Sequence, residues 1–350
     1  MVHLRLLVAT IVALLVLAAC AGETASPQET GTDPGETDGN GSTEETPEPT
    51  MKSGSARVGS GGDVSMAQLP TLMAIERLNE MGYEIEWVEF EGSDSELAAV
   101  AAGELDMSGA GMPQQLAAMD AGLDHKFFLS RYVNEFAFVA ASSIQSCEDL
   151  AGQPVGLHSR TGTSGTLTQL WVDQNCGVEP DYIIIEGSEN QLIALLQGQI
   201  VAASIDLQNT EALLHEAPDD FHVLVSHAEA LPIYGGTFSA SSEFLAENEE
   251  LILDFIRVHL DVWDEIYENP DVLLQRAQEE LPQVDPELIP SLVESYLEFQ
   301  IFPRDGGITQ ENTELSMEIY GQNEPYQNIS EYSDVADRSY LERALEERGG

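Results

Sequence analysis

Two short loops of this chain carry the residue types that bind small polar solutes. One is the run Ser60-Gly61-Gly62-Asp63-Val64-Ser65, and the other is His158-Ser159-Arg160-Thr161-Gly162-Thr163-Ser164-Gly165. Each follows a short apolar strand and precedes an amphipathic helix, so free N–H groups and the positive end of a helix dipole point at a ligand. A guanidinium among such donors favours a bound sulfonate or carboxylate. Ordinary helix capping is the alternative for either loop alone.

Further polar residues follow strands later in each half of the chain. We expect N–H and hydroxyl donors around the polar head of a solute, with Met or Tyr against its apolar part. Asp63 or Asp206 would instead receive an amino group. The candidate ligand-binding residues are Ser60, Gly61, Asp63, Ser65, Met66, Gly109, Gly111, Met112, Ser159, Arg160, Thr161, Gly162, Thr163, Ser164, Asp206, Asn209, Tyr234 and Thr237.

The motifs of common enzymes are absent from the sequence. There is no GxSxG, no HExxH and no GxxxxGK[ST], and His222 and His227 lack metal spacing. We therefore expect no catalytic residue, no cofactor and no metal site, with a hydrolase or lyase as the enzymatic alternative. The 62 acidic residues outnumber 13 basic ones, a net charge of −49, which excludes nucleic acid as a partner.

The N-terminus predicts export. Arg5 precedes a short apolar run that ends in Leu17-Ala18-Ala19-Cys20, the layout of a signal peptide over residues 1–19. The sequence around Cys20 resembles the bacterial lipobox, which implies a lipidated cysteine and an extracytoplasmic protein anchored to the cell membrane. A plain signal peptide is the alternative. Residues 20–56 are small, polar and acidic, which predicts a disordered linker.

An internal repeat indicates how the candidate residues are positioned. The segment 91–105 aligns without gaps on 186–200, an offset of 95 residues. Each copy reads as strand, helix, strand, which predicts an α/β fold with two similar lobes, although chance similarity of two such units is the alternative. The expected N-caps and C′ glycines of the two helices are Ser93 with Gly103 and Ser188 with Gly198.

The chain resembles the nitrate/sulfonate/taurine and thiamine-pyrimidine group of solute-binding proteins that serve ABC importers. The resemblance rests on ELAAVAAGELDMSGAG, SCEDLAGQPVGLHSRTGTSG, GSENQLIALLQGQIVAASID, LPIYGGTFSASSEFLAENEELILDFI and DRSYLERAL, in this order. It implies the type II periplasmic-binding fold, with a ligand cleft between two lobes joined by hinge strands. Lobe 1 would be 57–138 plus 238–350, lobe 2 would be 143–232, and the hinge strands 136–141 and 235–240.

The resemblance implies a monomeric receptor that passes a small solute to an ABC permease and its ATPase. The best candidate solute is a sulfonate, taurine-like compound or other small organic anion. The alternatives are a pyrimidine, thiamine precursor or other aromatic nutrient, and a sensing lipoprotein without an importer. The segment from Asp206 to Glu211 lacks the family's Asn-Glu-Pro, which weakens the pyrimidine assignment. The sequence does not decide whether Arg160 or an acid selects the solute.

Cys147 and Cys176 remain once Cys20 is assigned to the lipid. Cys147 opens a short helix before the strand at Pro154, and Cys176 ends the helix that returns beside that strand. Both are thus expected at one end of lobe 2. Outside the cytoplasm such a pair is expected to form a disulfide, with two buried free thiols as the alternative.

Overall fold

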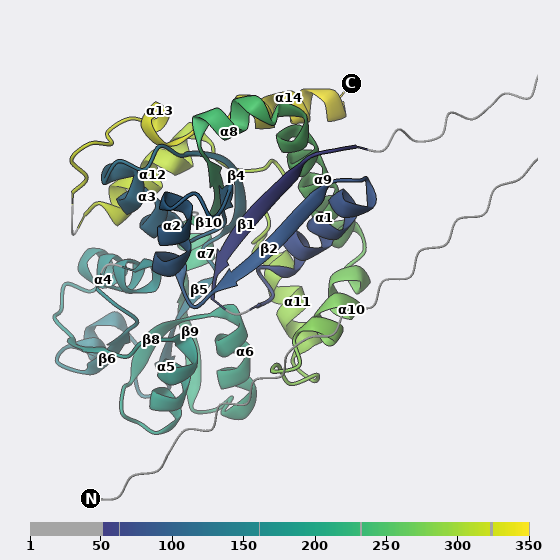
Figure 1. Cartoon of the computed structure of the whole chain (residues 1–350). Helices are drawn as coiled ribbons and strands as arrows, with labels where there is room; N and C mark the ends of the chain where they lie inside the picture. Colours follow the sequence, from purple (N-terminus) through teal and green to yellow (C-terminus); the bar gives the residue numbers. More distant parts are fainter. Residues whose placement is uncertain (1–51, 63, 161, 232, 323–324, 350) are drawn as a thin grey trace, which may run out of the picture. The chain divides into compact units, whose positions relative to one another are not determined.

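The computed structural model describes residues 52–62, 64–160, 162–231, 233–322 and 325–349. Within them, strands and helices alternate and form two five-stranded sheets flanked by helices (Figure 1). The predicted α/β class is confirmed. The predicted signal peptide, Cys20 and the linker up to residue 51 lie outside the described residues. No helix in the described ranges is long and apolar enough to cross a membrane.

The first sheet has the strand order β2-β1-β3-β10-β4. β1 pairs in parallel with β2 and β3, whereas β10 runs antiparallel to β3 and β4. The carboxyl ends of β1, β3 and β4 therefore lie at the same edge of the sheet. The strands are β1 (Ser55–Gly61), β2 (Glu84–Phe90), β3 (Met107–Ser108), β4 (Lys126–Val133) and β10 (Tyr234–Ala240).

The core of this sheet is built on α9 (Glu249–Glu268), whose apolar face is buried against α1 (Leu69–Glu80) and α14 (Ser339–Gly349). Aromatic rings join α9 to the sheet, with the Phe238 and Phe255 centroids 5.0 Å apart. The remaining helices of these two parts of the chain, before β4 and after β10, are α2 (Ser93–Ala101), α3 (Met112–Asp120), α8 (Ser242–Glu247), α10 (Asp271–Glu280), α11 (Ile289–Glu298), α12 (Gln310–Tyr320) and α13 (Tyr332–Val335).

The second sheet has the order β7-β6-β8-β5-β9. β6 is parallel to β7 and β8, and β5 runs antiparallel between β8 and β9, so β5 begins at the edge where the parallel strands end. Its strands are β5 (Phe136–Ala141), β6 (Pro154–Leu157), β7 (Asp181–Ile184), β8 (Ala202–Asp206) and β9 (Phe221–Ser226). Its helices are η1 (Cys147–Leu150), α4 (Thr163–Asn175), α5 (Ser188–Leu196), α6 (Leu207–Glu216) and α7 (His227–Ala230).

The chain crosses between the sheets twice, after β4 and before β10. Asn134 of the first crossing hydrogen-bonds to the second: its N–H donates to the Ile233 carbonyl at 2.9 Å and its Nδ2 to the Leu231 carbonyl at 2.6 Å. Residues 136–141 and 235–240, predicted as hinge strands, are sheet strands within β5 and β10. Because β4 ends and β5 begins at this crossing, the carboxyl edges of both sheets meet there.

The repeat is visible in the fold, with one correction to its capping. α2 begins at Ser93 and α5 at Ser188, but the N-caps are the preceding glycines, Gly92 and Gly187, so the predicted serine N-caps are wrong by one residue. The predicted C′ glycines are confirmed by their positive φ angles, 73° at Gly103 and 67° at Gly198. Only glycine adopts this conformation without strain.

The two serines make a different and equally repeated hydrogen bond. Ser93 Oγ accepts from the Gly111 N–H at 3.4 Å, and Ser188 Oγ accepts from the Asp206 N–H at 3.3 Å. Both donors lie 18 residues after their acceptors, so the two bonds are equivalent under the repeat. Each bond ties the start of a helix to the turn that follows the next strand, which positions that turn.

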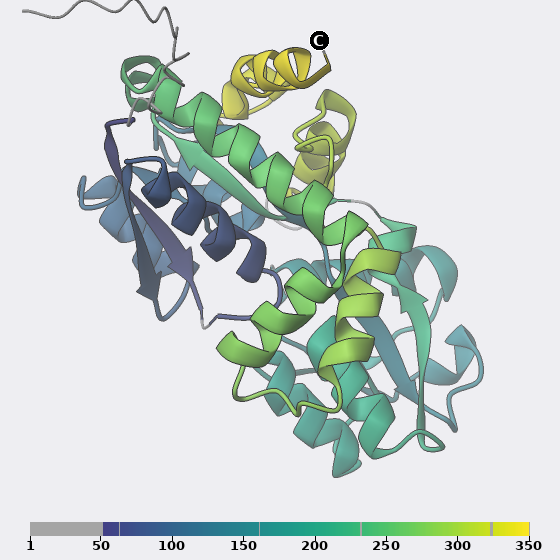
Figure 2. The ribbon, with the colours of Figure 1, turned by 90° about the vertical axis from the view of Figure 1, so that its right-hand side faces the viewer.

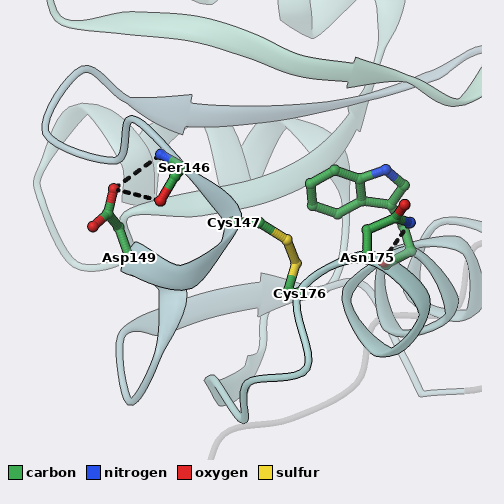
Figure 3. Close-up of a disulfide and its surroundings, with 6 residues drawn as sticks. Ser146, Cys147, Asp149, Asn175 and Cys176 are labelled. Carbon is green, nitrogen blue, oxygen red and sulfur yellow. Dashed lines mark hydrogen bonds between the residues drawn. A yellow bond between two sulfur atoms is a disulfide. The ribbon is translucent and has the colours of Figure 1, made fainter.

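A disulfide joins Cys147 to Cys176, as predicted (Figure 3). Their Cα atoms are 5.0 Å apart, and their positions in the sequence differ by 29. Cys147 begins η1, which has a capping box between Ser146 and Asp149, and Cys176 is the C-cap of α4. The bridge thus links the connection before β6 to the end of the helix after it.

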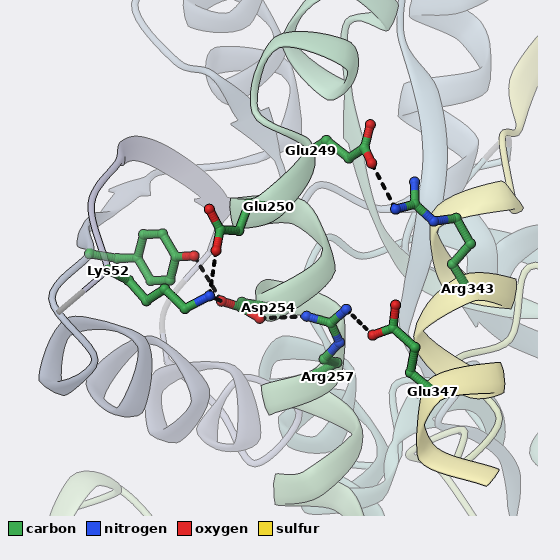
Figure 4. A network of polar contacts seen from close by, with 8 residues as sticks. Lys52, Glu249, Glu250, Asp254, Arg257, Arg343 and Glu347 are labelled. Atoms are coloured by element: carbon green, nitrogen blue, oxygen red, sulfur yellow. Dashed lines mark hydrogen bonds and ion pairs between the residues drawn. The ribbon is translucent and has the colours of Figure 1, made fainter. Parts of the chain in front are cut away.

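A polar network ties the start of the described chain to α9 and α14 (Figure 4). Lys52 Nζ lies 3.2 Å from Asp254 Oδ2, and Arg257 pairs with both Asp254 and Glu347. Burial alone would raise the pKa of Asp254, but hydrogen bonds from Tyr83, Lys52 and Arg257 hold it below its usual value. Glu347 is largely exposed, so its pair with Arg257 contributes at most about 1 kcal/mol.

Candidate functional site

A guanidinium lies buried at the carboxyl edge of the first sheet. Arg131 of β4 is 3% exposed, and its Cζ lies 5.7 Å from the Trp87 ring centroid, 5.3 Å from that of Tyr132 and 5.6 Å from that of Phe238. Its Nη1 donates to the Gly109 carbonyl just beyond β3. Its Nε is buried and has no hydrogen-bond partner among the described residues. Native interiors rarely leave such a donor unused, so this one indicates a ligand or water.

Two more groups at this edge have unused hydrogen-bonding capacity. Glu96 of α2 is fully buried; its Oε1 accepts from Ser108 Oγ at 2.7 Å and from the Gly109 N–H at 2.8 Å. Burial raises the pKa of Glu96, an effect that the nearby Arg131 charge partly opposes. Within the described ranges, Glu96 Oε2 and the buried Ser60 Oγ lack partners, as Arg131 Nε does. The edge therefore offers one cation, one hydroxyl and one buried carboxyl.

Carboxyl groups dominate at the crossing. Glu135 accepts a hydrogen bond from the Tyr296 hydroxyl of α11. Burial, and then the charge of Asp206, raise the pKa of Glu135 well above its usual 4.5. Asp206 caps α6, since its Oδ1 accepts from the Asn209 N–H at 2.8 Å and from Asn209 Nδ2 at 3.0 Å. Asp206 and Asn209, both predicted as site residues, thus form one capping unit beside the crossing.

The loop after β6 closes tightly on α4. Ser159 Oγ accepts from the Gly162 N–H at 2.8 Å, and a Cβ on Gly165 would lie 1.8 Å from the Ser159 carbonyl oxygen, so only glycine fits there. Arg160 is exposed; its carbonyl accepts from Gln169 Nε2 at 2.9 Å, and its charge acts on Tyr182 of β7. Arg160 therefore lies near the outer strand of the second sheet, while its neighbours Thr163 and Ser164 form the first turn of α4.

The loop after β1 is positioned by a similar close approach. A Cβ on Gly61 would lie 2.4 Å from the Ser93 backbone nitrogen, so the strand end packs directly on the start of α2. Ser65 Oγ and its N–H both donate to Gln68 Oε1, at 2.5 and 3.0 Å, which closes the loop before α1. Ser60 and Gly61 thus lie at the same edge as Arg131, together with Gly109 and Gly111.

Four predicted site residues lie in packed interiors. Met66 and Met112 are fully buried in hydrophobic clusters, and Tyr234 is 1% exposed. Thr237 is fully buried, and its Oγ1 accepts from Gln115 Nε2 at 3.0 Å. Two others, Asp63 and Thr161, lie outside the described residues.

Sequence reasoning missed the buried charges. Arg131 stands in the apolar strand KFFLSRYV, and a cation in an otherwise buried strand was the available signal. Glu96 lies inside the repeat and aligns with Gln191, whose Oε1 is also buried without a partner among the described residues. The repeat thus places a Glu in the first sheet where it places a Gln in the second, and burial raises the pKa of that Glu. In the described ranges, no three His, Cys, Asp or Glu side chains are grouped to hold a metal ion.

The structure is similar to several solved binding proteins. The periplasmic aliphatic sulphonate binding protein SsuA from Escherichia coli is 18% identical, covers 76% of this chain and 85% of its own, and gives a TM-score of 0.63. A putative periplasmic sulfonate-binding SsuA from Methylobacillus flagellatus is 15% identical, with 85% and 95% coverage and a TM-score of 0.68. The periplasmic nitrate-binding protein NrtA from Synechocystis is 10% identical, with 84% and 88% coverage and a TM-score of 0.64.

These likenesses establish the type II periplasmic-binding fold. The prediction that the chain is not an enzyme is in keeping with neighbours whose titles name binding proteins. None of the curated protein sequences compared with the chain matches it. A family model described as NMT1/THI5 like matches residues 71–272, which run from α1 into the start of α10 and include both crossings and every strand of the two sheets except β1. Since that match covers more than half of its residues, the chain belongs to the NMT1/THI5-like family.

Proposed function

We propose that this protein is an extracytoplasmic receptor that binds a small organic anion, most simply a sulfonate, and delivers it to an ABC importer. The observation that supports this most is the buried Arg131 guanidinium, whose Nε has no partner among the described residues. A desolvated arginine binds an oxyanion strongly and with defined geometry. The solved neighbours include proteins whose titles name sulfonate and nitrate as their solutes.

Two arginines of the proposed site are candidates for the residue that selects an anionic solute. Arg131 lies at the edge of the first sheet, and Arg160 lies in the loop before α4 of the second. Solute bound by both edges would hold the lobes together, since the carboxyl ends of the strands meet at the crossing. Hinge closure of this kind is how two-lobed receptors trap a ligand. Arg131 is the better selector, because it is buried and a charge pair in a desolvated site is worth more.

A thermal-shift panel of alkanesulfonates, taurine, nitrate, pyrimidines and amino acids tests the solute class. A ligand at a hundredfold over its dissociation constant stabilises the folded state by about 2.7 kcal/mol, which is readily measured. We expect anions to raise the melting temperature, and stabilisation by neutral or cationic compounds alone would contradict the proposal. An aromatic nutrient is the second candidate, because Trp87 and Tyr132 flank Arg131 and the buried carboxyl of Glu96 can pair with a heterocycle.

The proposed membrane anchor is a lipid on Cys20, after cleavage of residues 1–19. Its support is the sequence Leu17-Ala18-Ala19-Cys20. Intact-mass measurement of the protein extracted from its native membrane should give a diacylated Cys20, and Cys20→Ser should release the protein from the membrane fraction. An unmodified Cys20 at the mature N-terminus would sink this part of the proposal.

A further inference from the structure

A groove lies between α10 and α11, and none of the residues that line it belongs to the proposed solute site. It has a volume of about 620 Å³, and its apolar lining includes Leu274 of α10 together with Val293 and Leu297 of α11. Leu274 and Leu297 are half-buried, and Tyr267 at the end of α9 completes the floor. In Figure 2 these two helices form the light-green pair beside the long green α9. Grooves of this size and composition accept the apolar face of a short helix.

The rim of the groove is acidic. Asp271, Glu294 and Glu298 line it, and all three are exposed. Arg304 stacks on the Tyr267 ring, 5.5 Å from its centroid, but its charge is balanced by Asp264 at 2.7 Å. An apolar floor with an acidic rim is complementary to an amphipathic helix that carries Lys and Arg beside its apolar residues.

Charge excludes two other occupants. Residues 21–51 of this chain contain Asp and Glu but neither Lys nor Arg, so the N-terminal segment is repelled by the rim. A second copy of a chain with net charge −49 is repelled in the same way. We therefore infer that the α10–α11 groove is a docking surface for a cationic amphipathic helix of a membrane partner, which under the proposed function is the importer.

The groove is well placed to influence the solute site. On α11, Tyr296 holds Glu135 of the crossing, and Ser295 Oγ donates to Glu211 Oε1 of α6 at 2.8 Å. A partner seated in the groove therefore contacts the helix that touches both the crossing and the second lobe. Any change of solute affinity on docking must be matched by an equal change of docking affinity when solute binds.

The test is fluorescence anisotropy with the purified full-length protein and a labelled 15-residue peptide. The peptide carries Leu at helical spacing on one face and Lys or Arg on the other, and a scrambled peptide has the same composition. We expect the amphipathic peptide to bind at least about tenfold more tightly than the scrambled one, a difference of roughly 1.4 kcal/mol. No solute is needed, so failure of this test is distinct from failure of the proposed function.

Two pairs of substitutions locate the binding. Leu274→Ser with Leu297→Ser keeps the charge and should abolish the preference for the amphipathic peptide. Glu294→Gln with Glu298→Gln should weaken binding more than the matched neutralisation Glu243→Gln with Glu247→Gln on α8, where both acids are exposed. Melting curves verify that each variant folds. Equal binding of both peptides, or equal effects of the two neutralisations, would show only general attraction to an acidic protein and would overturn the inference.

Discussion

Replacing Arg131 with Met separates a ligand-binding arginine from a structural one. In the unliganded protein the substitution removes the hydrogen bond to Gly109 and the contacts with three rings, and a cation–ring contact at a desolvated site is worth about 2 kcal/mol. It also removes a buried charge whose unpaired Nε costs about 1–3 kcal/mol. These terms oppose each other, and Met fills much of the volume, so we expect the unfolding free energy to fall by about 3 kcal/mol at most.

Binding of an anionic solute should respond much more strongly. Loss of a desolvated charge pair costs about 2–4 kcal/mol, which is roughly a 30- to 1,000-fold weaker affinity. Urea unfolding without solute and calorimetric titration with the best anion of the panel measure the two effects separately. Arg160→Met is the matched control, expected to have the smaller effect on affinity. A destabilised Arg131→Met protein that still binds normally would refute the reasoning, and loss of binding only in Arg160→Met would move the selector to the loop before α4.

Three further predictions concern the disulfide and two buried carboxyl groups. Cys147→Ala with Cys176→Ala should lower the unfolding free energy by about 3–4 kcal/mol, as a cross-link between residues 29 apart predicts, with unchanged solute affinity in calorimetry. Glu96→Gln should be as stable as the wild type below pH 4.5 and more stable above it. The pKa of Glu96 is raised in the folded state, so the wild-type protein loses unfolding free energy as the pH rises above 4.5, whereas the Gln variant does not. Urea unfolding at several pH values checks this, and a difference that does not change with pH would contradict it. Tyr296→Phe removes the hydroxyl that donates to the buried Glu135, and should lower the free energy of unfolding in urea by about 1–3 kcal/mol. An unchanged free energy of unfolding would mean that water replaces the tyrosine hydroxyl as the donor to Glu135.

The sequence predicts most of the scaffold because the scaffold rests on local signals. The C′ glycines of α2 and α5, the strands before each helix and the position of both cysteines follow from turn chemistry and apolar runs, and all are present in the structure. The serine N-caps at Ser93 and Ser188 failed, because the hydroxyls accept from turns 18 residues later. A rule that considers only neighbouring residues cannot predict these hydrogen bonds. Each donor N–H comes close to its serine only after the strand between them has joined the sheet.

The site was predicted less completely for the same physical reason. The turn between the first strand and the first helix can be recognised from its small polar residues. Ser60 and Gly61, predicted to lie in that loop, are instead the last two residues of β1, and they do lie at the carboxyl edge. Arg131 becomes a candidate only when β2, β3 and β4 are brought into one sheet, since its neighbours Gly109 and Trp87 are distant in sequence. Burial, not residue type, distinguishes it from Arg160, and burial is a property of the tertiary structure.

The most direct test of the account is a pair of calorimetric titrations of the purified protein. One uses the alkanesulfonate that the panel selects, and the other uses the sulfonamide of the same alkyl chain, which has nearly the same shape but no charge. We expect saturable binding of one sulfonate per chain, at least about a hundredfold tighter than binding of the sulfonamide, a difference of roughly 2.7 kcal/mol. Equal binding of the two compounds, or saturable binding of neither, would contradict the claim that this protein is a receptor for a small organic anion.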